Sequence, residues 1–419
     1  MKNYGKNTES IKTNRKEINM KAIPVTLKLF LRCSVISIVF AIGGCSSTEV
    51  KTTEITPVFH VTDNIPENEL LDIGITIFDP GLEALADQED DALVFPEIRV
   101  AESSYFPYIL METVQSSAAW GAVRVIPVGH QSVDVTVKGS IIHSDGEMLD
   151  IGISVYDSSG RHWFTKSYHD KASHYAYNKK TQLRYEPFQN IYNQITNDLN
   201  SYREKLSSKE LQHIRLVSEL TFAQSFSQQM FSQYIESNEQ GRIVINRLPA
   251  EDEPMMLRIR KIRERDYLFI DTLQEYYGSY VKEMKAPYKE WRHESLKEVV
   301  AMRRMEHKAR NQKIIGAVAI IAGILGAGNS SGSVRAGSII GMTAGGYILK
   351  DGMERSEEAL IHVGALQELG DSLEASIESQ VIELEDRTVT LSGTVENQYQ
   401  QWRKILKEIY QVDTDKPFL

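Results

Sequence analysis

Residues 133–168 constrain the fold of this 419-residue chain more than any other segment. Apolar and polar side chains alternate in three stretches of it, at 133–142, 148–156 and 161–168. This alternation is the pattern of a strand with one buried face. The sequences between the stretches, SDGE and DSSG, are typical of tight turns. We therefore predict that three consecutive strands pair in one sheet.

The flanking sequence extends this sheet into a domain over residues 69–205. Residues 71–79 and 122–127 also alternate and predict two more strands. Between them, the serine pair at Ser103 can cap a helix that accepts Pro107 in its first turn. A second helix follows the last strand. The order of one strand, one helix, four strands and one helix predicts an α+β fold, with a mixed or antiparallel sheet and helices on one face.

Four residues of this domain, Asp134, Gly139, Asp157 and Gly160, carry a resemblance to a superfamily of periplasmic lipoproteins. Its members have an Asp before an alternating strand, a Gly within the strand and a hairpin that ends in D-x-x-G. They include the curli-secretion lipoprotein, the N-terminal domain of the Tol-system propeller protein and lipoprotein activators of peptidoglycan synthases. The resemblance covers about a third of the chain and implies a domain that binds partners or oligomerises. An unrelated α+β domain is the alternative.

Half of the ten histidines fall in this domain: His130, His143, His162, His169 and His174. His162 and His169 are an odd number of residues apart, which predicts that they point to opposite faces of a strand. No Cys and no H-E-x-x-H spacing accompanies them. The sequence therefore predicts no metal site and no cofactor.

The N-terminus has the features of an export signal. A basic stretch from Met20 precedes an apolar run at 33–42, which is too short for the roughly 20 residues that span a bilayer. The following Ile-Gly-Gly-Cys resembles a bacterial lipobox. The resemblance implies that residues 1–44 are removed and that Cys45 carries a diacylglyceryl group.

Ser46 follows this cysteine, where an Asp is usual in lipoproteins kept in the inner membrane of Gram-negative bacteria. Ser resembles the kind sorted to the outer membrane. Residues 45–68 are polar and predict a flexible tether. We expect a periplasm-facing protein that is anchored by lipid to the outer membrane.

Composition and charge exclude several classes of protein. The chain has two cysteines, too few for a disulfide framework or a tetrathiolate zinc site. Residues 1–44 hold eight Lys and Arg and two acids, so their removal changes the net charge from -10 to -16. This acidic balance predicts that the exported protein does not bind nucleic acid.

Helical periodicity dominates residues 206–312, with a short extended piece at 243–245. The end of this region is basic and precedes an apolar segment. The basic residues are Arg303, Arg304, Lys308, Arg310 and Lys313. They predict either a contact with lipid phosphates or a solvated helix face.

Residues 313–350 contain two uncharged arms, 314–328 and 336–349, joined by a polar turn. Small residues recur at every fourth position, which lets two helices approach closely. The glycines expected to make this packing are Gly316, Gly323, Gly337, Gly341 and Gly345. The segment resembles the glycine-zipper hairpins of outer-membrane lipoproteins. Three interpretations stay open: a hairpin in the membrane, a zipper that assembles copies of the protein, and a hairpin buried in a soluble core.

The C-terminal segment 351–419 predicts a helix, two strands and a helix, at 354–376, 381–385, 388–395 and 397–410. This order and the sequence RTVTLSGTV resemble a BON domain, a small envelope module associated with phospholipid contact. A helical hairpin with a β turn is the alternative.

The sequence has no G-x-S-x-G, no phosphate-loop lysine and no Rossmann fingerprint. We therefore expect no enzyme, and instead a lipid-anchored envelope protein with a binding or scaffolding role. The partner is not identified by the sequence, and a homo-oligomer is one option. The alternative function is an oligomeric subunit of an outer-membrane secretion or assembly channel.

Overall fold

The computed structural model describes residues 55–62, 64–83, 96–130, 132–172, 176–177, 186–250, 252–312, 377–383 and 388–415. Several sequence predictions fall outside these residues: the signal at 1–44, the lipid site Cys45, the helix at 354–376, and the glycines Gly316, Gly323, Gly337, Gly341 and Gly345. Within the described ranges, no helix is both long enough and apolar enough to cross a membrane.

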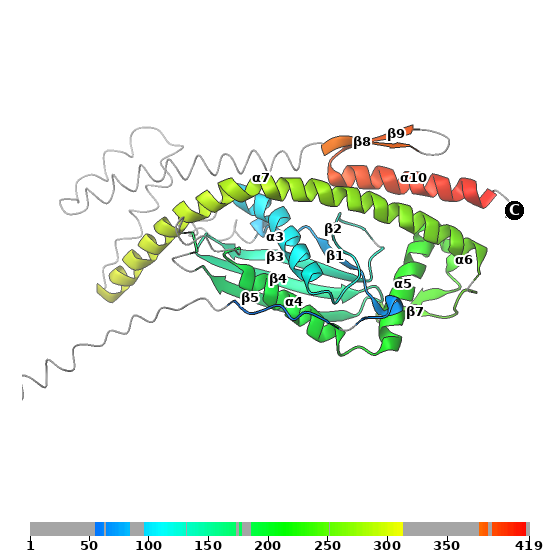
Figure 1. Ribbon diagram of the computed structural model, residues 1–419, viewed down its shortest axis with the longest axis horizontal. Coiled ribbons are helices and arrows are strands. Elements are labelled where there is room, and N and C mark those ends of the chain that lie inside the picture. The colour runs from blue at the N-terminus through cyan, green and yellow to red at the C-terminus, as the bar shows by residue number, and fades with distance from the viewer. Residues whose placement is uncertain are drawn as a thin grey trace, which may run out of the picture. The chain divides into compact units, whose positions relative to one another are not determined.

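Five strands form a mixed sheet in the order β2-β1-β3-β4-β5 (Figure 1). The strands are β1 Ile73–Thr76, β2 Val123–Ile126, β3 Val135–Ser144, β4 Met148–Asp157 and β5 His162–Lys171. β1 is parallel to both β2 and β3, whereas β3, β4 and β5 are antiparallel. The predicted α+β class and the three consecutive paired strands are confirmed.

One face of the sheet is buried. Along β4, every second side chain from Leu149 to Val155 is fully buried, while those between are partly exposed. Helices α3 (Pro96–Ser116) and α4 (Gln189–Arg203) share one hydrophobic core with these side chains. The period-two pattern of the sequence thus corresponds to a face covered by helices and a face that is partly open.

Helix α3 begins at Pro96 and not near Ser103, where the sequence prediction placed its cap. The Ser103 hydroxyl donates instead to the Val100 carbonyl oxygen inside the helix, at 2.6 Å. Pro107 therefore lies in the helix interior and not in its first turn, which corrects the prediction.

Helices dominate the middle of the chain. They are α5 Ser208–Phe226, α6 Gln228–Phe231 and α7 Pro254–Gln312, whereas the short 3-10 helix η2 Glu67–Glu69 precedes β1. The extended piece predicted at 243–245 is strand β7 (Ile243–Ile245), which pairs with β6 (Ile235–Ser237). α7 is a single helix of 59 residues with Pro287 in its interior. It packs against α3, α5 and β2, so it connects the sheet domain to the helical region.

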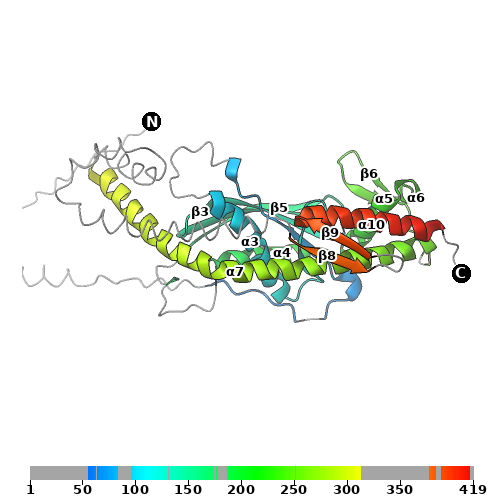
Figure 2. The same cartoon turned by 90° about the horizontal axis from the view of Figure 1, so that it is seen from above.

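The C-terminal residues form β8 (Ile377–Glu383), β9 (Thr388–Gly393) and α10 (Val395–Asp415). Figures 1 and 2 both show α10 alongside α7. On α7, the Phe269 ring stacks on Trp402 and Tyr399 of α10, with centroids 5.4 and 6.4 Å apart. The last helix therefore belongs to the same core as α5 and α7.

The sequence prediction for His162 and His169 is wrong. His162 pairs with Tyr156 of β4 and His169 pairs with Asp150, and these two β4 residues share a face. The register shifts at the end of β4, because a β-bulge places an extra residue in β5. The bulge reverses the alternation, so both histidines lie on the partly open face.

Candidate binding groove

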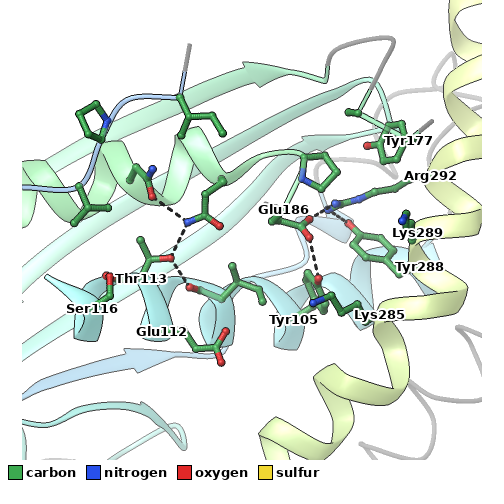
Figure 3. Close-up of a pocket in the computed structure, with 18 of the residues that line it drawn as sticks. Tyr105, Glu112, Thr113, Ser116, Tyr177, Glu186, Lys285, Tyr288, Lys289 and Arg292 are labelled. Atoms are coloured by element: carbon green, nitrogen blue, oxygen red, sulfur yellow. Dashed lines mark hydrogen bonds and ion pairs between the residues drawn. The ribbon is translucent and has the colours of Figure 1, made fainter. Parts of the chain in front are cut away.

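A cavity of about 690 Å³ opens between α3, the start of α4, α7 and the extended segment 55–60 (Figure 3). Its polar lining includes Tyr105, Glu112, Thr113, Ser116, Tyr177, Glu186, Gln189, Asn193, Lys285, Tyr288, Lys289 and Arg292. These residues are distant in sequence, so only the folded chain brings them together. Concave sites with a few fixed polar groups are where proteins usually bind ligands.

The floor of the groove is a chain of hydrogen bonds between α3 and α4. The Gln189 side-chain nitrogen donates to the Thr113 hydroxyl at 3.1 Å and to the Asn193 oxygen at 3.0 Å. Thr113 in turn donates to the Ile109 carbonyl oxygen at 2.8 Å. Since each side chain is held by the next, the floor presents its polar atoms in fixed positions.

Arg292 and Glu186 form the inner wall. Arg292 on α7 is 2 % exposed and makes an ion pair with Glu186, which also accepts a hydrogen bond from Tyr105 at 3.1 Å. Figure 3 shows Glu186 between these two side chains. The guanidinium lies over the Tyr288 ring, 3.9 Å from its centroid. A buried charge that is paired and stacked in this way is fixed in one orientation.

A fully buried carboxylate, that of Glu102, lies behind this wall. It accepts hydrogen bonds from Ser144 at 2.6 Å and from Tyr288. Burial raises the pKa of Glu102, although Arg99 and Arg292 act in the opposite direction. Burial alone would lower the pKa of Arg292, but Tyr288 and Glu186 beside it hold that pKa well above its ordinary value. The arginine therefore keeps its charge inside the protein.

The mouth of the groove carries both signs of charge. Glu112 is exposed on α3, and Lys285 and Lys289 are exposed one turn apart on α7. Partial burial raises the pKa of Glu112, and Lys285 counteracts this rise. Because Arg292 is neutralised by Glu186, the two lysines are the cations that the described part of this mouth offers to a ligand.

The extended segment at one side of the groove is held by a row of asparagines on α4. Asn190, Asn193, Asn197 and Asn200 all bind main-chain atoms of residues 56–59. Val61 continues this contact, since its N–H donates to the Ser117 carbonyl oxygen of the turn after α3 at 3.0 Å. Residues 56–61 therefore lie docked on the protein, although the sequence predicted a flexible tether over 45–68.

The four residues that carry the superfamily resemblance have structural roles outside the groove. Asp134 is buried, and a side chain on Gly139 would collide with the Phe78 ring. Asp157 accepts hydrogen bonds within its own turn, where Gly160 has a φ of +80°. Cys45 and the zipper glycines lie outside the described residues, so the structure does not bring them to the groove.

Sequence reasoning missed the groove and the asparagine row. The row had a signal, because asparagines at 190, 193, 197 and 200 fall on one face of a helix. The groove had none, since its charged residues come from α3, from α7 and from Glu186 just before α4, which are far apart in the sequence. Among the described residues, no group of three or more His, Cys, Asp or Glu side chains is placed to hold a metal ion.

Comparisons with known proteins give no relative for this chain: no protein-family model, no curated protein and no solved structure matches it.

Proposed function

We propose that this chain is a lipid-anchored protein of the bacterial cell envelope whose body binds a partner protein through the groove. The anchor is the diacylglyceryl group on Cys45, and the body faces the periplasm from the outer membrane. The export signal and the lipobox-like Ile-Gly-Gly-Cys support the anchor. The resemblance of the sheet domain to partner-binding periplasmic lipoproteins supports the binding role.

The observation that carries the binding role is the fixed polar lining of the groove. Its floor and inner wall are hydrogen-bonded or ion-paired, whereas the mouth offers exposed Glu112, Lys285 and Lys289. Such a surface is preorganised, so binding loses little side-chain freedom.

Site-specific cross-linking in cells tests the groove. A photo-reactive residue at Ser116, which lines the groove, should yield a covalent adduct with one partner protein. The same residue at Gln229, exposed on α6, is the matched control and should not. Replacing Lys285 and Lys289 by Glu should weaken the Ser116 adduct. Equal adducts at the two positions, or no effect of the charge reversal, would remove the groove from the proposal.

Lipid labelling and detergent extraction test the anchor. Labelled palmitate should enter the protein and be lost in Cys45→Ser, which should also leave the membrane fraction. In mild detergent the protein should be a monomer or a small oligomer. A large symmetric ring would instead favour the channel subunit over a binding protein.

A further inference from the structure

The asparagine row of α4 binds an extended chain through its main-chain atoms. Asn190 accepts from the Thr56 N–H at 3.1 Å, and Asn193 donates to the Thr56 carbonyl oxygen at 2.8 Å. Asn200 donates to the carbonyl oxygen of Phe59 at 3.1 Å. No side chain of residues 56–59 takes part in these bonds.

Asn197 binds the main chain of this segment through both polar atoms of its carboxamide. Its oxygen accepts from the Phe59 N–H at 2.9 Å, and its nitrogen donates to the Pro57 carbonyl oxygen at 2.9 Å. One carboxamide thus supplies both a donor and an acceptor to one extended chain, as a neighbouring strand does. Phe59 is 60 % exposed, so its side chain contributes little to the binding of this segment.

The composition of α4 favours a specific role for the row. Asparagine is a poor helix former, about 0.5 kcal/mol or more less favourable than alanine at each position. Four such residues on one face of a helix of 15 residues weaken the helix, and other contacts must offset this cost. Here each of the four binds the same segment.

We propose that the asparagine row is a binding site for an extended polypeptide main chain, held here by residues 56–59 and open to exchange with an extended segment of the partner protein. The inference rests on the proposed function, because it states the chemistry of the partner. Asn193 both lines the groove and holds Thr56, so a partner in the groove lies directly beside the segment that it would replace.

The docked segment competes from within the same chain. A tethered competitor acts at an effective concentration on the order of 1 mM, so a free peptide binds weakly until the tether is loosened. Replacing both Thr56 and Phe59 by proline removes the two N–H groups that donate hydrogen bonds to the row. This pair of substitutions should therefore free the row.

The experiment uses the exported chain, residues 46–419, and a fluorescent peptide with the sequence of residues 54–62. The peptide should bind the chain with Thr56→Pro and Phe59→Pro about tenfold or more tightly than the unsubstituted chain. Adding Asn197→Ala to the proline pair should remove this gain. A second peptide that differs only at the exposed positions Pro57, Phe59 and His60 should bind within about threefold, because the row binds main-chain atoms there.

Amide hydrogen exchange gives a second measurement. It uses the unsubstituted chain, so it does not depend on whether a variant folds. An excess of the peptide should accelerate exchange at Thr56 and Phe59 and leave β4 unchanged. Two results would overturn the inference. One is a peptide affinity that neither the proline pair nor Asn197→Ala changes. The other is binding of only one of the two peptides. The Ser116 adduct is measured separately, so a failed peptide experiment with a retained adduct would leave the proposed function intact.

Discussion

Gly139 lies where β3 crosses the Phe78 ring. A Cβ at this position would overlap the ring carbons of Phe78, which is 1 % exposed and cannot move into solvent. Gly139→Ala should therefore lower the free energy of unfolding by about 1–3 kcal/mol, the usual effect of overpacking. Urea unfolding measures this loss. Combining it with Phe78→Leu should recover part of the stability, and additive losses would contradict a direct clash.

Glu210 gives the protein a local sensitivity to acid. It accepts a hydrogen bond from the Ser207 N–H and one from Arg161 at 3.0 Å, and these two bonds lower its pKa to about 2. The ordinary value is 4.5, so the folded protein holds the proton less tightly than the unfolded chain does. The stability from this group is complete above pH 4.5 and is lost as the pH falls from there to about 2.

Glu210→Gln should therefore lower the melting temperature at pH 7 and have a smaller effect at pH 3. Circular dichroism melts across this range measure the difference. Glu204→Gln, at the exposed end of α4, is the matched control and should show no such convergence. A constant difference between pH 7 and pH 3 would contradict the capping role.

At the scale of elements, Gln274 of α7 protects an edge of the sheet. Its side chain accepts from the Val125 N–H and donates to the Val125 carbonyl oxygen, each at 2.8 Å. β2 is the edge strand on this side, and free edges invite pairing with other chains. One carboxamide thus takes the place of a neighbouring strand.

Gln274→Leu leaves both main-chain groups of Val125 without this partner and should cost about 1–3 kcal/mol of stability. Gln274→Glu keeps an acceptor for the N–H and should cost less. Chemical unfolding measures both stabilities. Light scattering measures aggregation, which should begin earlier for the leucine variant because its sheet edge is free. Equal stabilities for all three proteins would contradict the protective role.

The strands were predictable because their information is local. Residues 148–157 alternate along the whole of β4, and each neighbouring turn carries its own glycine. The β-bulge in β5 was not predictable, because no residue type marks it and one extra residue reverses the alternation. The start of α3 was misplaced for a different reason, since Ser103 looks like a cap but bonds within the helix.

The groove and the docked segment depend on the whole molecule, which sequence periodicity does not describe. The ion pair of Arg292 and Glu186 joins residues 106 positions apart, and the Asn193 contact with Thr56 spans 137 positions. A helix pattern predicts which side of α7 is apolar but not which element covers it. The sequence therefore predicted elements well and the candidate site not at all.

Trp402 holds the C-terminal residues to the rest of the molecule. It is 4 % exposed and stacks on Phe269 of α7. Trp402→Ala should remove about 3–5 kcal/mol of packing and release residues 388–415. Limited proteolysis should then cut α10 while amide exchange in β4 stays slow. Val412→Ala is the matched control, because Val412 is 55 % exposed, and it should change neither proteolysis nor exchange. Equal loss of exchange protection in α10 and β4 of the Trp402 variant would show that the two unfold as one unit.

The docking of residues 56–61 also limits how far the body would reach from the proposed lipid anchor. With Cys45 in the bilayer as proposed, ten residues, or eleven Cα-to-Cα steps, separate the lipidated cysteine from the first docked position, Thr56. Fully extended, they span at most about 40 Å, whereas a tether free to residue 68 would span about 80 Å. With the proposed anchor, the asparagine row would keep the body within about half the distance from the membrane that a tether free to residue 68 would allow.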